Sequence, residues 1–557
     1  MSARPASPGA PAPYKMSPEH RRVFGGLMLG MFVASVSQTI VGPAMPRIVA
    51  ELGGMEHYSW VATAAMLVSA VTVPIVGKLS DLYGRRGFYL GGIAVFVIGT
   101  LVCGFAQSFW MLIAGRAIQG MGMGTLMPLS QTIIGDIIPA RQRGKYQGLM
   151  GAVFGVTSVA GPLAGGVITD HLGWRYLFFT AVPIGLVALY ILWRFLHLEH
   201  QRREAKIDVA GIVALTVGLT TLLAALSLGG TTYAWSSAQI VALVLVGVVA
   251  IVAFVLIERR AVEPVLPLRL FRSGIFTWSV VAAFAVSVAM FGAIMYIPVF
   301  AQGVLGVNAT NSGLILMPLM VGFISLGIVT GMLITRTGRY KPFMVVGVVI
   351  MGVGYWLLTR LGYGSSTGAL TGTMVVVGVG LGMCMQQYTL VVQNNADRAD
   401  MGVATAATQF FRNVGSTVGI AIFGTAMTTG LGDAIVKYIP DEIAAKLPPG
   451  GGIDAGAVLD PAKLQELPAV VAEAVRQGLG DRLHIVFLLG LPTLAIALAA
   501  TLLIKVTPLR DTLAPKNAED SGHELLDAMS SSAAGVDDDL SGDADRRDDE
   551  NRLARRA

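Results

Sequence analysis

Fourteen long apolar stretches constrain this chain of 557 residues more than any other feature of its sequence. Each is 20 residues or longer, the length that a helix needs to cross the roughly 30 Å hydrocarbon core of a bilayer. Because backbone in lipid must satisfy its own hydrogen bonds, and because the stretches are continuous rather than alternating, we expect helices and not a β-barrel. The expected spans are 23–46, 58–78, 88–108, 110–135, 146–169, 174–197, 208–229, 236–257, 275–302, 312–334, 342–361, 367–392, 403–428 and 483–506.

Charged residues make up 13% of the chain, about half the share found in ordinary soluble domains. A soluble enzyme, a coiled coil and a disordered protein are therefore excluded. Cys103 and Cys384 lie inside apolar stretches and provide neither a disulfide framework nor a metal cluster. The sequence also lacks a phosphate-binding loop and the common hydrolase motifs, so we expect no enzyme activity, no cofactor and no metal site.

The Lys and Arg residues predict the orientation of the spans, because cytoplasmic loops are enriched in both. With the N-terminus in the cytoplasm, 24 of them outside the C-terminal tail face the cytoplasm and eight face outward. An even number of spans returns the C-terminus to the same side. We therefore expect a multi-pass protein of the cytoplasmic membrane with both termini inside. The excess of Lys and Arg over Asp and Glu lies in the membrane loops, so it does not indicate that the protein binds nucleic acid.

A parallel repeat predicts the domain organisation. The stretch GKLSDLYGRR that begins at Gly77 recurs 254 residues later as GMLITRTGRY from Gly331, and Gly161 and Gly165 match glycines at the same offset. Two six-helix copies related by an axis along the membrane normal are a known transporter architecture, with the substrate site at the midplane. We expect a disordered cytoplasmic arm at 1–20, a six-helix bundle at 21–200, two inserted helices at 201–272, a second six-helix bundle at 273–510 and an acidic, disordered cytoplasmic tail at 511–557.

The second bundle contains one long outer loop, 429–482. A PPGGG break at 448–452 is followed by apolar residues at helical spacing, namely Leu464, Leu467, Val471, Ala474 and Val475. The simplest interpretation is an amphipathic helix lying on the membrane surface or on neighbouring helix ends. The alternative is a lid over the outer exit.

Four motifs stand in order along the first five spans: QTIV at 38–41, GKLSDLYGRR at 77–86, RAIQG at 116–120 and a glycine-rich segment with GPLAGG at 155–166. With these motifs the chain resembles the major facilitator superfamily, and more closely its fourteen-helix drug:proton antiporters. The resemblance covers about residues 20–510. It implies an all-α polytopic membrane protein of the major facilitator fold, with two six-helix bundles plus two inserted helices.

The same resemblance implies a charge relay of Asp81, Arg85 and Asp136 that latches the two halves together on the cytoplasmic side. The candidate latch residues are Gly77, Asp81, Gly84, Arg85, Arg86 and Asp136. Thr335 replaces the aspartate in the second copy of the motif, so we expect a lopsided latch. In the fifth span, Gly161, Pro162 and Gly165 are candidates for a flexing point, because proline weakens a helix.

Arg116 and Arg412 are the two basic residues that lie inside the expected spans and away from their ends. A charge there is costly and indicates a function by default, although the side chain of Arg412 has an alternative, which is to reach the interface. Many relatives carry an aspartate in the first span where this chain has Ser37, and no acid lies in the middle of any span. The candidates for proton coupling are therefore Arg116, Asp170 and His484, since histidine titrates near pH 6.5.

Polar and aromatic residues in mid-span predict the lining of a substrate cavity, and abundant methionine suits a promiscuous surface. The candidates are Gln38, Gln119, Tyr296, Gln386, Gln387, Gln409, Arg412 and Asn413. We expect a monomeric secondary transporter that exports amphipathic organic compounds by alternating access in exchange for protons. Two alternatives remain open, a lipid flippase on the same scaffold and a membrane sensor that does not transport.

Overall fold

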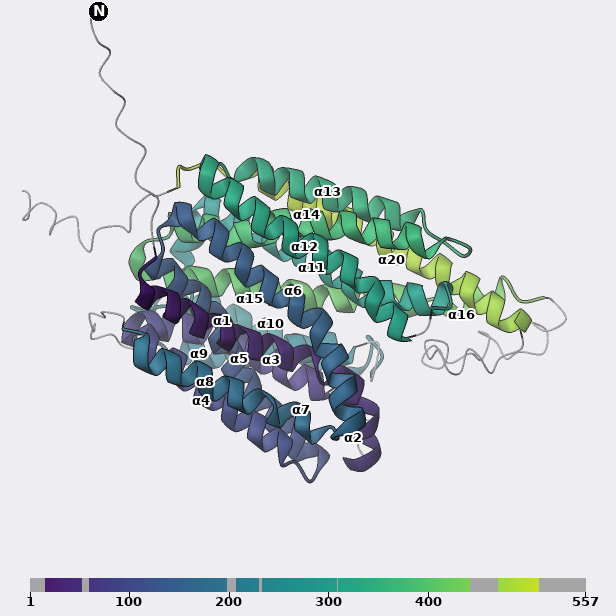
Figure 1. Cartoon of the computed structure of the whole chain (residues 1–557), viewed down its shortest axis with the longest axis horizontal. Coiled ribbons are helices and arrows are strands. Elements are labelled where there is room, and N and C mark those ends of the chain that lie inside the picture. The colour runs from purple at the N-terminus through teal and green to yellow at the C-terminus, as the bar shows by residue number, and fades with distance from the viewer. Residues whose placement is uncertain are drawn as a thin grey trace, which may run out of the picture. The chain divides into compact units, whose positions relative to one another are not determined.

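The computed structural model describes residues 16–52, 60–197, 207–229, 233–307, 309–440 and 469–509. These residues form helices joined by short connections (Figure 1). The first bundle contains α1 (Pro18–Thr39), η1 (Gly42–Ala44), α2 (Met45–Leu52), α3 (Trp60–Tyr83), α4 (Arg85–Gly104), α5 (Phe109–Ile137), α6 (Ala140–His171), α7 (Arg175–Phe179) and α8 (Ala181–Phe195). The inserted pair is α9 (Val209–Leu228) and α10 (Ala238–Glu258).

The second bundle follows a short turn, η3 (Leu268–Arg272). It contains α11 (Gly274–Val299), η4 (Phe300–Val304), α12 (Ala309–Thr337), α13 (Lys341–Thr359), α14 (Thr367–Asn395), η5 (Arg398–Asp400), α15 (Met401–Thr428), α16 (Leu431–Val436) and α20 (Ala469–Leu503). The predicted tail at 511–557 and the middle of the predicted outer loop lie outside the described residues.

Twelve of the described helices or joined helices are long and apolar enough to cross a membrane. Two more, α5 with 29 residues and α15 with 28, have the length but contain Arg116 and Arg412 among several Gln, Thr and Gly residues. Both are largely buried by their neighbours. Together these helices account for the fourteen predicted spans, and the expected all-α polytopic fold is confirmed.

Several predicted helix ends were wrong, and local chemistry explains the differences at both ends of the first span. The first span begins at Pro18 rather than 23, because the Ser17 hydroxyl caps it by accepting the His20 N–H at 3.1 Å. It ends at Thr39 rather than 46, where the Gly42–Pro43 pair opens a 3-10 turn. The predicted span 174–197 is two helices that meet at Thr180.

The last span is the largest correction, because α20 begins at Ala469 and not at 483. Its first turns include Val471, Ala474 and Val475, which were predicted to form a separate surface helix. Ala474 and Val475 are buried, and Gly478 lies against Ile435 of α16, so packing on α16 continues the transmembrane helix into the outer loop.

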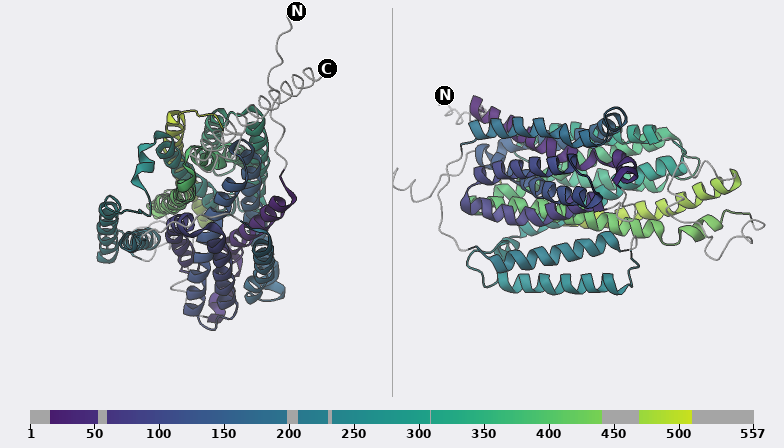
Figure 2. Two further views of the ribbon diagram at one scale, coloured as in Figure 1. Left: turned by 90° about the vertical axis from the view of Figure 1, so that its left-hand side faces the viewer. Right: turned by 90° about the horizontal axis from the view of Figure 1, so that it is seen from below.

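The inserted pair packs as a hairpin beside the bundles, as the view from below shows (Figure 2). Small residues bring the two helices together, with Gly218 against Ile251 and Gly247 against Leu222. One helix of the pair, α9, contacts α3 of the first bundle and α15 of the second. The outer face of α10 is mostly exposed apolar surface, as expected of a helix that faces lipid.

Candidate functional site

The two bundles meet most closely at one end, which is called the Asp81 end below. Gly144 of α6 lies so close to α12 that an added Cβ would stand 2.7 Å from the Gly331 carbonyl oxygen, and Gly148 approaches Gly327 equally closely. The pseudo-equivalent contact is between Gly77 of α3 and Ala406 of α15. The glycine that opens each copy of the repeated motif therefore packs against the opposite bundle, where a side chain would separate the helices.

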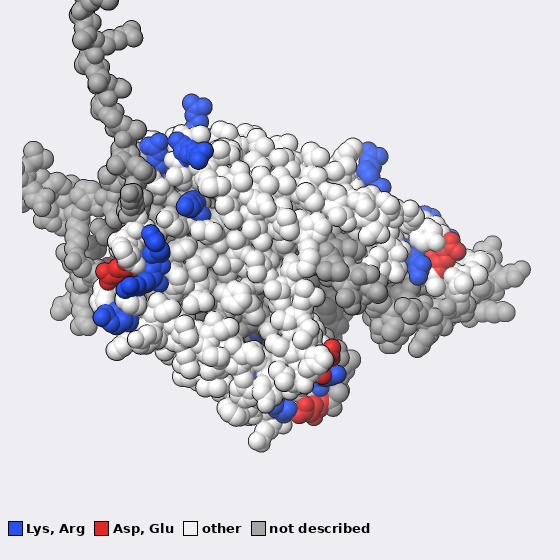
Figure 3. All heavy atoms as spheres, in the orientation of Figure 1, with Lys and Arg blue, Asp and Glu red and all other residues white. Residues whose placement is uncertain are grey.

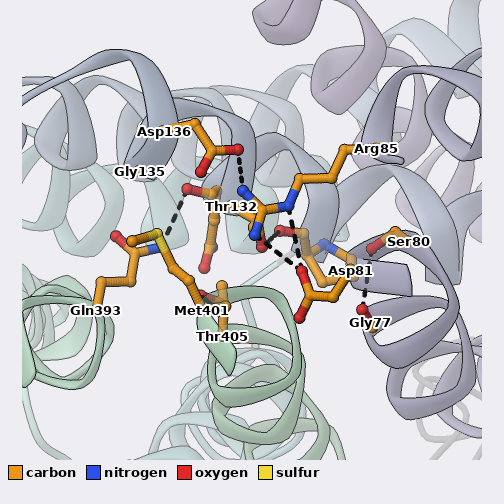
Figure 4. Close-up of polar contacts among 12 residues, drawn as sticks. Gly77, Ser80, Asp81, Arg85, Thr132, Gly135, Asp136, Gln393, Met401 and Thr405 are labelled. Carbon is orange, nitrogen blue, oxygen red and sulfur yellow. Dashed lines mark hydrogen bonds and ion pairs between the residues drawn. The ribbon is translucent and has the colours of Figure 1, made fainter. Parts of the chain in front are cut away.

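Arg85 lies between two carboxylates at this end (Figure 4). Its Nη2 is 2.8 Å from Asp81 Oδ1, and its Nη1 bonds Asp136. The side chains of Arg85, Asp81 and Asp136 are only 11%, 4% and 12% exposed. Burial strengthens such charge-assisted bonds and makes the loss of one partner costly.

Asp81 also connects the two bundles directly. Its Oδ2 accepts the backbone N–H of Val403 at 2.9 Å, in the first turn of α15. A carboxylate is favoured there, because the N-terminus of a helix carries partial positive charge and unpaired N–H groups. Nearby, Gln393 Nε2 of α14 donates to the Gln131 carbonyl of α5 at 3.0 Å. These hydrogen bonds between the bundles all lie at the Asp81 end.

Two further residues of the motif have other roles. Gly84 adopts φ 99° in the one-residue connection between α3 and α4, a conformation that favours glycine. Arg86 donates to the Trp193 carbonyl at 2.8 Å, so it holds α8 to α4 within the first bundle. The second copy of the motif makes a different contact, because Thr335 stands in place of the aspartate. The backbone carbonyl of Thr335 accepts a hydrogen bond from Arg141 of α6 at 3.3 Å.

A cavity lies between the bundles, beyond these contacts. It contains about 950 Å³ of space outside atoms, part of it open to solvent. Four helices of each bundle contribute: α1, α3, α5 and α6 from the first, and α11, α12, α14 and α15 from the second. Because both halves line it, the cavity lies where transporters built from two six-helix repeats bind their substrates.

Five of the predicted cavity residues line it: Gln38, Gln386, Gln409, Arg412 and Asn413. Three do not. Gln119 is buried and donates to Thr100 Oγ1 at 2.8 Å. Gln387 is buried one position away from Gln386, on a different face of α14, and Tyr296 lies near Gly424 outside the cavity lining.

Arg116 also lies away from the cavity lining, with 2% of its surface exposed. Its Nε donates to the Val61 carbonyl at 2.9 Å, and its Nη1 donates to the Ser37 carbonyl at 3.0 Å and to Gln119 Oε1 at 2.6 Å. These acceptors come from α3, α1 and α5, so the guanidinium fastens three helices of the first bundle.

The two titratable coupling candidates lie at the opposite end. Asp170, whose side chain is 67% exposed, is 3.3 Å from Arg47. His484 is exposed, and its Nδ1 is 2.8 Å from the Thr359 carbonyl. Neither lines the central cavity.

The predicted flexing segment belongs to a continuous helix. α6 runs from Ala140 to His171 through Pro162, and Gly161 and Gly165 pack against Thr39 and Ile40 at the end of α1. In the second bundle, Gly415 and Gly419 pack in the same way against α11.

Sequence reasoning missed most of the apolar lining. The apolar lining consists of Met31, Met66, Ala70, Val73, Met127, Met150, Met290, Met385, Phe154, Phe291 and Phe323. Abundant methionine indicated a cavity of this character, but sequence alone could not say which methionines face it. Ser69, Ser287, Ser416 and Thr417 were missed for the same reason.

The charges of the molecule follow the same division into two ends. On the face drawn in Figure 3, Lys and Arg side chains with few acidic ones gather at one end, Lys, Arg, Asp and Glu stand together at the other, and the surface between them is almost uncharged. A broad uncharged zone between two charged ends is the form of a protein that spans a bilayer.

Comparison with known proteins identifies the class to which this fold and cavity belong. The model of the Major Facilitator Superfamily matches residues 27–420. The chain is 38% identical over 531 residues to "Multidrug transporter protein MdtP" of Bacillus subtilis, covering 91% of this chain and 97% of the relative. It is 34% identical to "Multidrug resistance protein 3" of the same organism, covering 86% and 93%.

Among solved structures, the human organic anion transporter MFSD10 superposes with a TM-score of 0.55 at 15% identity. The match covers 86% of this chain and all of that one, and at this identity it bears on the fold alone. The chain belongs to the major facilitator superfamily. It is a multi-pass membrane transporter of small molecules and not an enzyme, and its resemblance to the drug exporters of that superfamily is confirmed.

Proposed function

We propose that the chain exports amphipathic organic compounds across the cytoplasmic membrane by alternating access, in exchange for protons. The observation that carries the proposal is the central cavity, which both bundles line. At the Asp81 end, contacts between the two bundles close this cavity. With the basic Asp81 end in the cytoplasm, the described conformation faces outward. Multidrug transport by relatives that match nearly the whole chain supports the same substrate class.

Proton coupling needs a group whose charge changes during the cycle. Among the described residues that line the cavity none is a carboxylate, so we propose that coupling acts through the latch carboxylates. Protonation of Asp81 would weaken its bonds to Arg85 and to the Val403 N–H, and so favour opening at the cytoplasmic end. Asp170 and His484 remain candidates for proton entry from the outside.

Transport by inverted membrane vesicles tests the proposal. Vesicles acidified inside should accumulate fluorescent drugs and release protons, and an uncoupler should abolish both. Drug uptake that is insensitive to uncoupler and to pH would remove proton coupling but keep export. Absence of uptake for every drug, together with movement of labelled lipid between leaflets, would replace export by the flippase alternative.

A further inference from the structure

Arg412 is the one charged side chain among the described residues that line the cavity. It lies on α15, and its Nε and Nη1 are buried without any hydrogen-bond partner among the described residues. Arginine remains charged in proteins, and a buried cation is costly unless it is paired. Arg412 therefore places unused donors in the wall of the central space.

Arg116 provides the contrast within the same molecule. It is also buried in a span, but three oxygen acceptors from the protein surround it. Arg116 is thus a structural cation whose bonds are made in the empty transporter. Arg412 lacks such acceptors, and an incoming molecule can supply them.

The neighbours of Arg412 extend the polar side of the cavity. Gln409, Arg412, Asn413 and Ser416 recur three or four residues apart, and all four line the cavity from one face of α15. Gln409 Nε2 donates to Asn413 Oδ1 at 3.1 Å, which leaves the amide N–H groups of Asn413 to donate elsewhere. The methionines and phenylalanines of both bundles supply the apolar part of the cavity lining.

We propose that the preferred substrates are amphipathic organic anions whose carboxylate or sulfonate binds Arg412 while the apolar body packs against the methionines and phenylalanines. The inference rests on the proposed export function and specifies its substrate class. A planar guanidinium matches a carboxylate with two parallel bonds. With no lining carboxylate described to offset Arg412, a cationic drug of the same size is repelled.

A matched probe series tests the charge preference. The probes are 1-pyrenebutyrate, 1-pyrenebutanol and 1-pyrenebutyltrimethylammonium, which share one apolar body and differ in charge. The purified full chain in proteoliposomes should bind and exchange the anion about tenfold better than the alcohol, the scale expected of charge-assisted hydrogen bonds. The cation should bind worst.

Variants assign the preference to its residue. Arg412→Gln should bind the anion and the alcohol equally, and Arg412→Lys should keep part of the preference. Arg360→Gln is the matched control, because Arg360 is exposed at the end of α13, stacked on Trp356 and away from the cavity lining. It should keep the wild-type ranking. Binding of the alcohol to Arg412→Gln reports that the variant is folded.

The outcomes separate the two proposals. Equal transport of the three probes, or preference for the cation, would overturn the anion inference and leave drug export intact. An anion preference that survives in Arg412→Gln would overturn the assignment to Arg412. Failure to move any of the three probes, together with failure to move the drugs tested in vesicles, would overturn export and the anion inference with it.

Discussion

At the scale of single residues, position in the bundle decides what each charged side chain does. Arg85, Arg116 and Arg412 are all removed from bulk water, yet Arg85 pairs with two carboxylates, Arg116 binds oxygen acceptors of the protein, and Arg412 faces the cavity unpaired. The sequence placed Arg116 and Arg412 inside apolar spans and Arg85 in the motif between two spans. Only the rotation of each helix determined which one reaches the cavity.

Asp81→Asn should reduce the initial rate of drug transport by about tenfold or more, because charge-assisted bonds of about 1.5–3 kcal/mol set the balance between the two conformations. The neutral amide weakens the bond to Arg85 and the cap on Val403. Transport into inverted vesicles, corrected for the amount of protein, measures the effect. Glu19→Gln is the control, because its side chain is 58% exposed at the same end of the first bundle. Equal rates for wild type and Asp81→Asn would exclude the latch.

The carboxyl group of Glu51, at the end of the molecule opposite Asp81, predicts that the stability of the fold depends on pH. Bonds from Arg175 and Trp174 hold the pKa of this carboxyl, on α2 outside the spans, below its ordinary value of 4.5. A lowered pKa in the folded state means that the bonds stabilise the fold fully above about pH 4.5 and are lost as pH falls through the lowered value.

Glu51→Gln should therefore lower the Tm of the purified protein at pH 7, and the difference from wild type should shrink as the pH falls below 4.5. Thermal unfolding in detergent across this pH range measures it. A difference that stays constant with pH would mean that the ionised carboxylate contributes nothing.

At the scale of elements, hydropathy was sufficient to find the helices because each must cover its backbone in lipid over a fixed length. Helix ends depend instead on caps and packing. The Ser17 cap starts α1 earlier than hydropathy predicted, and packing of Gly478 on Ile435 accompanies the early start of α20. The lining of the cavity was the least predictable feature. Gln386 and Gln387 are adjacent and chemically identical, yet one lines the cavity and the other is buried.

Closure between α6 and α12 depends on glycine, so Gly144→Leu should hold the Asp81 end open and abolish transport without preventing folding. An added side chain would meet the Gly331 backbone. Gly166→Leu on the same helix is the matched control, because an added Cβ there has no neighbour within 4 Å. Drug transport and the elution profile of the purified variants measure the effect. Normal transport by Gly144→Leu would show that this contact is not required.

At the scale of the whole molecule, the arrangement of charge predicts orientation. Cys103 and Cys384 are buried, so a single surface cysteine reports its own side of the membrane. Arg260→Cys, next to the Asp81 end, should react with a membrane-impermeant maleimide only in inverted vesicles. Arg360→Cys, at the opposite end, should react only in intact cells. The reverse pattern would place the basic end outside and turn the proposed direction of transport around.

The unpaired guanidinium in the cavity has an electrical consequence. With no opposite charge described beside it, the empty transporter of the proposed alternating-access cycle would move a net positive charge when it reorients, whereas a transporter loaded with a monovalent anion would move almost none. One elementary charge across 100 mV corresponds to about 2.3 kcal/mol. An inside-negative membrane would therefore drive the return of the empty transporter toward the cytoplasm, and the voltage would be a second source of energy for the proposed export.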